Sequence, residues 1–243
     1  MTSTTTTSKP LHLYTYPTPN GIPVAAYLEE LKAAYPGVVD YEATHVDLYK
    51  GVQKEAWFKK VNPVGQIPAL VDYTRSRPGD DDKKDSDSQG FAIFDGVAIL
   101  FYLAQNYDKE FKFSFNPVKE VEEFSEMVQW LMFTGSGLAP RFGECRYYRV
   151  VAPGKGSDHV VNRNVELLRN FFSVLEARLT SRDYLVGRGK GKYSLADMRA
   201  WPHIKFHEVT GIESLEEYPN LKAWLERCFE RAGSKNGFEV GKA

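Results

Sequence analysis

The stretch "YTYPTPNGIPVAAYLEEL" (residues 14–31) decides the first part of the fold. Its aromatic and β-branched residues stop at two prolines and an Asn-Gly pair, a combination typical of a strand that ends in a turn. Apolar side chains then recur three or four residues apart, which predicts an amphipathic helix over residues 21–34. Free N–H groups at the start of such a helix, together with its dipole, favour an anion. The stretch therefore predicts a strand, a polar loop and a helix that offers an anion site.

The segments around this stretch continue the alternation of strands and helices. Strands are predicted over residues 11–16, 40–46, 67–73 and 91–94, and further helices over residues 53–61 and 97–107. The order βαβαββα predicts a small layered α/β domain over residues 11–108. Residues 75–90 are strongly charged and predict a solvated hairpin loop. Residues 1–10 have no apolar core, so a flexible tail is expected there and no signal peptide.

Long helical patterns replace the strands in the second half of the chain. Helices are predicted over residues 120–133, 160–179, 194–209 and 218–232, and "TGSGLAP" (residues 134–140) predicts a break or kink. An all-helical domain is therefore expected over residues 120–234, after a linker at 109–119 and before a tail at 235–243. The predicted fold class is α/β followed by all-α.

Composition excludes several classes of function. The net charge of -1 gives no support for a role at nucleic acid or at a membrane surface. Cys145 and Cys228 are isolated, which argues against a disulfide framework, a metal site and dithiol redox chemistry. No apolar run approaches the roughly 20 residues of a membrane span. We therefore expect a protein that resides in the reducing cytoplasm and binds no metal.

Four motifs in chain order resemble the glutathione-transferase family. They are "TPNG" (18–21), "NPVGQIPALVD" (62–72), "FDGVAILFYL" (94–103) and "YSLADMRAWPHI" (193–204). Within the family, "TPNGIPVAAYLEEL" and "WLMFTGSGLAPRFGECRYYR" look most similar to the fungal Ure-type branch, named for a yeast nitrogen regulator. The resemblance implies a thioredoxin-like glutathione domain, an all-helical domain, glutathione as co-substrate and a homodimer.

Glutathione would give the predicted anion site a thiolate to stabilise. Lowering a thiol pKa from ~8.5 to ~6.5 takes about 2.7 kcal/mol. A partly buried helix N-terminus supplies up to ~2 kcal/mol, and a charge-assisted hydrogen bond about 1.5–3 kcal/mol. Asn20 is the first candidate for that hydrogen bond, because the resemblance places the matching asparagine beside the glutathione sulfur. Thr18, Tyr14 and Tyr16 are the alternative donors, and a plain Asn-Gly turn is the structural alternative.

The remaining glutathione contacts follow from a short peptide with two carboxylates and one ammonium. A cis peptide bond before Pro68 would expose the backbone of Ile67 for pairing with this peptide, although most X-Pro bonds are trans. Relatives often have a polar or basic residue at the position of Gln66. Gln53 takes the place of a histidine near the glycyl carboxylate, and surface solvation is the alternative for both glutamines.

Asp95 and Gly96 depart from the Glu-Ser pair that is usual in the family. Asp95 keeps the charge that faces the ligand ammonium, or caps the following helix, or does both. Gly96 keeps a backbone N–H for the γ-glutamyl carboxylate but lacks the hydroxyl, at a cost on the order of 1 kcal/mol. Pro23 replaces the lysine that is common in relatives. Glutathione binding weaker than in typical members is therefore expected.

The second half of the chain supplies candidates for a second substrate pocket. Phe133, Arg141 and Tyr148, together with Tyr16, are predicted to line a pocket for an electrophile or a second thiol. Core packing is the alternative for the aromatic residues. Ser194 and Asp197 predict a capping box at a helix start, a structural feature. Met127, Leu131 and Phe133 suit a dimer face.

The sequence thus predicts an enzyme: a glutathione-dependent transferase or disulfide-bond oxidoreductase that acts on a small electrophile or disulfide. Peroxidase chemistry is also open, since Ure-type members generally favour reductase and peroxidase reactions over conjugation. The alternative is a non-catalytic regulatory or hydrophobic-ligand-binding protein on the same scaffold. The tail at residues 1–10 is too short and too threonine-rich for the Asn/Gln-rich segment of the yeast regulator.

Overall fold

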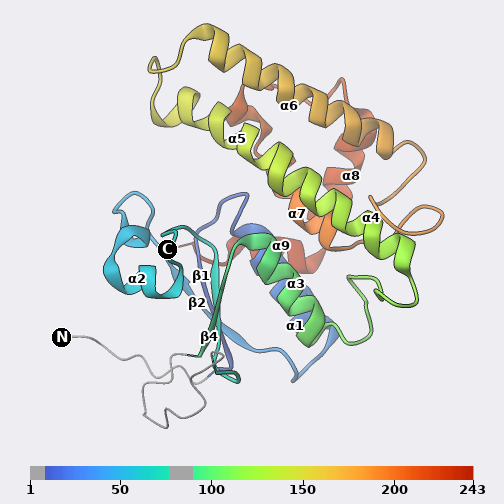
Figure 1. The fold of residues 1–243 in the computed structure, drawn as a ribbon. Coiled ribbons are helices and arrows are strands. Elements are labelled where there is room, and N and C mark those ends of the chain that lie inside the picture. The colour runs from blue at the N-terminus through green and yellow to red at the C-terminus, as the bar shows by residue number, and fades with distance from the viewer. Residues whose placement is uncertain (1–8, 77–89, 243) are drawn as a thin grey trace. The chain divides into compact units, whose positions relative to one another are not determined.

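The computed structural model describes residues 9–76 and 90–242 and divides into two units (Figure 1). Unit 1 contains the chain up to Lys109 together with Ala232 and the residues after it, and unit 2 is Glu110–Arg231. Most of the predicted loop at 75–90 and of the predicted tail at 1–10 lies outside the described residues.

Unit 1 is built on a four-stranded mixed sheet. Its strands are β1 (Leu11–Thr15), β2 (Tyr41–His45), β3 (Ala69–Asp72) and β4 (Phe91–Phe94), in the order β2-β1-β3-β4. β1 pairs in parallel with β2 and antiparallel with β3, and β4 closes the sheet antiparallel to β3. The predicted βαβαββα order is confirmed, and the fold of this unit is thioredoxin-like.

Helices cover both faces of this sheet. α1 (Ile22–Ala34) and α3 (Gly96–Tyr107) lie on one side, and the short helices η1 (Val52–Lys54) and α2 (Ala56–Val61) lie on the other (Figure 1). The expected core face of α1 is buried, including Val24 and Leu28. β3 runs antiparallel to both β1 and β4. The loop after β1, the loop before β3 and the start of α3 therefore lie at one end of the unit.

The end of the chain returns to unit 1. α9 (Ala232–Glu239) packs against α1, which leaves most residues of α1 buried. A tail was expected over residues 235–243. The stretch "GSKNG" (residues 233–237) is rich in poor helix formers, yet it is helical. The contact with α1 explains the difference: a Cβ added at Gly237 would lie 2.3 Å from the backbone nitrogen of Ala26, so the glycine permits the close approach.

Unit 2 is all-helical, as predicted. Its helices are α4 (Val121–Met132), α5 (Ala139–Arg146), α6 (Asp158–Arg178), α7 (Leu195–Lys205) and α8 (Pro219–Phe229), with the 3-10 turn η4 (His207–Thr210). α7 is buried along nearly its whole length and forms the centre of the unit. The predicted Ser194–Asp197 capping box starts it. Pro219 lies in the first turn of α8, where a proline is tolerated.

The segment that was predicted to break or kink the helix is a π-helical turn, so the break does not occur. η2 (Phe133–Leu138) connects α4 to α5 without leaving the helix, and a second π-helical turn, η3 (Tyr147–Val151), ends α5. A Cβ at Gly137 would lie 2.6 Å from the ring of Phe171 on α6. The small residues here serve close helix packing, and the wider turn accommodates Pro140 without a break.

Candidate functional site

The loop between β1 and α1 is a tightly fixed turn. The Thr18 carbonyl oxygen accepts from the N–H groups of Gly21 and Ile22 at 3.0 and 2.9 Å, and its hydroxyl oxygen accepts from Gly21 at 3.1 Å. A Cβ at Gly21 would lie 2.3 Å from the Tyr16 carbonyl oxygen, so only glycine fits. Asn20 is exposed directly before this glycine, at the N-terminus of α1. The expected strand-to-helix geometry is therefore present.

Thr18 has a structural function in this turn. Its hydroxyl already accepts one hydrogen bond inside the loop, although its proton is left for another acceptor. Tyr14 is turned away from such a function, since it stacks on His12 and packs against Phe58. Burial, with Tyr73 nearby, raises the pKa of Tyr14 well above its ordinary value. Of the four candidate donors, which include Tyr16, Asn20 is the exposed one.

The loop before β3 presents an unpaired backbone. The Ile67–Pro68 peptide bond is cis. The buried Asn62 holds this loop, because its amide donates to the Gln66 carbonyl at 2.6 Å and accepts from Val64 at 3.0 Å. Within residues 9–76 and 90–242, the N–H and C=O of Ile67 make no hydrogen bond. They have the donor and acceptor that an added extended peptide needs.

The start of α3 meets both of these loops. A Cβ added at Gly96 would lie 3.7 Å from the Asn20 carbonyl oxygen and 3.8 Å from Pro68 Cγ. Asp95 caps the helix, since its Oδ1 accepts from Val97 and Ala98 at 2.9 and 3.1 Å. The predicted cap is confirmed. Three segments that are far apart in sequence therefore converge around Gly96.

Gln53 and Gln66 differ in how they face this site. Gln66 is exposed. The amide nitrogen of Gln53 donates to the Leu48 carbonyl at 3.3 Å, and its amide oxygen is buried without a partner among the described residues. Gln53 would have to rotate outward to contact a carboxylate, so its predicted function has no support from its orientation here.

Sequence reasoning missed Lys54, the neighbour of Gln53. Its ammonium donates to the Gly65 carbonyl at 2.7 Å and approaches the Val64 carbonyl at 3.4 Å. Lys54 is exposed and places a positive charge beside the loop that carries Gln66 and Ile67. Its charge was visible in the sequence, but its contact with a loop ten residues away was not.

The predicted second-substrate residues belong to both units and are described separately. Tyr16, in unit 1, packs its ring 4.9 Å from the ring of His45. In unit 2, Phe133 lies between Trp130 and Phe171, with ring centres 5.1 and 4.9 Å away. The ring of Tyr148 lies over Gly156. The Phe133 contacts fit the packing alternative for this residue.

Arg141 differs from these aromatic residues. It is half-buried on α5, and its guanidinium makes no ion pair or hydrogen bond in the part of the chain that the structure describes. Such a cation is available to an anionic ligand.

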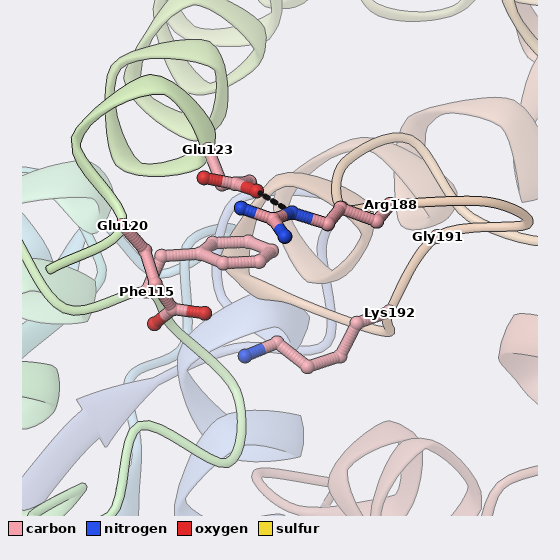
Figure 2. A pocket seen from close by; sticks show the side chains of 7 residues that line it. Phe115, Glu120, Glu123, Arg188, Gly191 and Lys192 are labelled. Carbon is pink, nitrogen blue, oxygen red and sulfur yellow. Dashed lines mark hydrogen bonds and ion pairs between the residues drawn. The ribbon is translucent and has the colours of Figure 1, made fainter.

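Unit 2 also has a cavity of about 430 Å³ that the sequence did not predict. Figure 2 shows its charged side chains, where Arg188 pairs with Glu123 at 2.9 Å. Lys192 lies 4.0 Å over the Phe115 ring and donates to the carbonyls of Phe111 and Ser114. These contacts of Arg188 and Lys192 hold the loop before α7 against the start of α4 and the residues that precede it.

Neither cysteine is suited to thiol chemistry. Both thiols are buried, and burial raises the pKa of Cys145 to about 11 and the pKa of Cys228 well above its ordinary value. In the described ranges, no group of three or more His, Cys, Asp or Glu side chains could hold a metal ion. No helix within those ranges is long and apolar enough to cross a membrane.

Comparisons with known proteins show which family and fold the chain is similar to. Residues 24–106 match the family model for the N-terminal domain of glutathione S-transferase, and residues 140–232 match the model for its C-terminal domain. The disulfide-bond oxidoreductase YfcG of Escherichia coli strain K12 is 31% identical over 221 residues, which cover 91% of each chain.

Two solved structures share the fold along nearly the whole chain. The glutathione transferase URE2P8 of Phanerochaete chrysosporium, solved with oxidised glutathione, has a TM-score of 0.80 and 29% identity, and 96% of each chain is covered. A glutathione transferase homologue of Lodderomyces elongisporus, solved with two glutathione molecules per subunit, has a TM-score of 0.78 and 30% identity. That match covers 95% of this chain and 98% of the other.

Proposed function

Because the chain belongs to the glutathione S-transferase family, we propose that it binds glutathione at the N-terminus of α1 and uses the bound thiolate to reduce disulfides or attack small electrophiles. The observation that carries this proposal is the convergence of Asn20, Pro68 and Gly96. The disulfide-bond oxidoreductase among the relatives and the transferase solved with oxidised glutathione support the disulfide reaction.

Asn20 stabilises the thiolate in this proposal. The exposed residue lies at the N-terminus of α1. The helix dipole there favours a negative charge by roughly 0.3–1 kcal/mol, and by up to ~2 kcal/mol once a bound ligand partly buries it. A hydrogen bond from its amide to the sulfur adds about 1.5–3 kcal/mol. The two contributions together reach the roughly 2.7 kcal/mol that a thiol pKa near 6.5 requires, so no separate base is needed.

Glutathione extends from Asn20 across the end of unit 1. Its backbone pairs with the N–H and C=O of Ile67 as an added strand. Its γ-glutamyl carboxylate accepts from the Gly96 N–H at the start of α3, and its ammonium faces Asp95, whose Oδ2 makes no hydrogen bond within the described residues. Lys54 attracts the glycyl carboxylate at the opposite end.

The disulfide reaction balances without a protein thiol. The bound thiolate attacks one sulfur of a substrate disulfide, a new S–S bond forms, and the second sulfur leaves as a thiolate. A second glutathione thiolate attacks the glutathione sulfur of this mixed disulfide and releases the substrate thiol and oxidised glutathione. Cys145 and Cys228 take no part, because both are buried with raised pKa values.

Arg141 is a candidate to hold the second anionic thiol, because it is half-buried and has no partner among the described residues. Beyond this site, the proposal includes a homodimer in the cytoplasm and a place in the Ure-type branch. The Ure-type resemblance of the helical domain and the likeness to URE2P8 support that branch.

Titration of reduced and oxidised glutathione by calorimetry tests the proposed site. We expect micromolar to low-millimolar binding of at least one form. Absorbance of the bound thiolate against pH then measures its pKa. Asn20→Ala should raise that pKa and cut turnover far more than it weakens binding, because the amide acts mainly on the thiolate.

Asn170→Ala is the matched control, since Asn170 is an exposed asparagine of α6 outside the site. An unchanged thiol pKa and turnover in Asn20→Ala would remove Asn20 from catalysis. Failure of the unsubstituted protein to bind either form would favour the alternative, a regulatory or hydrophobic-ligand-binding protein on this scaffold.

A further inference from the structure

The C-terminal residues lie against the segment that carries the proposed thiolate site. The backbones of α9 and α1 are in contact at Gly237 and Ala26. A Cβ added at Gly237 would lie 2.3 Å from the Ala26 nitrogen and 2.4 Å from its Cα. Earlier in α9, a Cβ at Gly233 would lie 2.5 Å from Cγ of the buried Glu30. These two glycines fix α9 closely on α1.

The chain beyond α9 then reaches the end of the sheet. Gly241 has a positive φ of 79°, and its carbonyl faces His45 of β2. The Nδ1–H of His45 donates to this carbonyl at 2.5 Å. Gly241 also touches Thr15 of β1, since a Cβ there would lie 2.8 Å from Thr15 Cγ2. The C-terminal turn thus contacts the last residue of each of the two parallel strands.

Those two strand ends hold the loop that presents Asn20. The His45 ring lies 4.9 Å from the Tyr16 ring, and Thr15 pairs with His45 in the sheet. Thr15 Oγ1 and the Tyr16 carbonyl oxygen both lie within 2.4 Å of where a Cβ of Gly21 would be. Any displacement of Thr15 or Tyr16 is therefore transmitted to Gly21, and so to the neighbouring Asn20.

We propose that His45 is a positioning residue for the thiolate site, acting through its hydrogen bond to the Gly241 carbonyl. This hydrogen bond, called the clasp below, joins the C-terminal turn to the end of β2. It thereby holds Tyr16 and the loop up to Gly21 in place. Asn20 then keeps its amide directed at the glutathione sulfur. The inference rests on the proposed function and adds a residue to its site.

Two C-terminal truncations and one substitution, each in the otherwise unsubstituted protein, test the hydrogen bond between His45 and Gly241. A chain that ends at Gly241 keeps an oxygen for His45, whereas a chain that ends at Val240 removes it. His45→Phe keeps a ring against Tyr16 but removes the donor. His159→Phe, at an exposed histidine of α6, is the matched control.

The Val240 truncation and His45→Phe should each lower kcat on the order of tenfold and raise the pKa of the bound thiol, with the Kd for reduced glutathione nearly unchanged. The chain that ends at Gly241 and His159→Phe should match the unsubstituted protein. Combining His45→Phe with the Val240 truncation should add nothing, because both remove one contact.

A lower melting temperature with unchanged kcat and thiol pKa would overturn the proposal and leave the contact purely structural. If the unsubstituted protein binds no glutathione, the proposed function fails. Amide hydrogen exchange then tests separately whether the hydrogen bond between His45 and Gly241 holds the loop in place. Faster exchange over residues 15–21 in the Val240 truncation than in the Gly241 truncation would support it, and equal exchange would overturn it.

Discussion

Gly96 begins α3 without a side chain at the point where Asn20 and Pro68 approach it. The nearest atoms to an added Cβ would be 3.7 and 3.8 Å away, which is ordinary van der Waals contact. A Cβ therefore fits without moving its neighbours. The hydroxyl of a serine would restore the hydrogen bond that the family resemblance leads us to expect at this position.

Gly96→Ser should tighten the binding of reduced glutathione. One added hydrogen bond to the γ-glutamyl carboxylate contributes on the order of 1 kcal/mol, which corresponds to a Kd about fivefold lower. Isothermal titration measures the change. Gly96→Ala adds the Cβ without the hydroxyl and should leave the Kd unchanged, so equal gains in both variants would contradict a hydrogen bond to the ligand.

Single residues of the site were predictable only where their function is local. Asp95 caps α3 through N–H groups two and three residues away, and the motif around Pro68 prompted the question of a cis bond that the structure contains. The inward rotation of Gln53 and the contact of Lys54 with Gly65 depend on how separate loops pack. No pattern in either segment encodes that packing.

Two helices of unit 2 begin with a serine cap in different surroundings. Ser194, at the start of α7, is buried, and its backbone N–H and hydroxyl donate to Asp197 at 3.0 and 3.2 Å. Ser157, at the start of α6, accepts from Val160 at 3.4 Å on an exposed turn. If the buried Ser194 hydroxyl is removed, no water can replace its hydrogen bond to Asp197.

Ser194→Ala should lower the free energy of unfolding by about 1–2 kcal/mol, because the buried Asp197 loses one of its donors. Ser157→Ala should cost less, about 0.5 kcal/mol, since water replaces its long hydrogen bond. Urea denaturation of both variants gives the comparison. Equal losses would show that burial does not control the cap energy.

Element order was predictable because hydrophobic periodicity and turn residues encode it along the chain. The strands and helices of unit 1 follow the predicted order, and Ser194 starts α7 as expected. The errors lie where a tertiary contact overrides propensity. The glycine at 137 permits packing against Phe171 inside a continuous helix, and Gly237 permits α9 to approach α1.

At the scale of the whole molecule, each unit contains a buried carboxylate, and the two respond oppositely to pH. Burial alone would raise the pKa of Asp72 in unit 1, but hydrogen bonds from Thr74, Tyr102 and Tyr107 lower it below its ordinary value. In unit 2, burial raises the pKa of Asp197 to about 6 despite its donors.

The signs of the two contributions follow from linkage. The contribution of Asp72 to stability is present above the unfolded carboxyl pKa of ~3.9 and is lost as pH falls through its lower folded value. The contribution of Asp197 is present below ~3.9 and is lost as pH rises through its folded pKa near 6. Acidification from neutral pH should therefore first favour the folded state through Asp197.

Asp72→Asn should flatten the fall in the free energy of unfolding below pH ~4, because the variant has no carboxylate left to protonate there. It should also be less stable at pH 7, where the ionised Asp72 accepts from two tyrosine hydroxyls at 2.6 and 2.7 Å. Urea midpoints from pH 3 to 7 measure both effects, with Asp158→Asn on an exposed turn as the control. If the free energy of unfolding fell as steeply below pH ~4 in Asp72→Asn as in the unsubstituted protein, the loss of stability in acid would belong to other carboxylates.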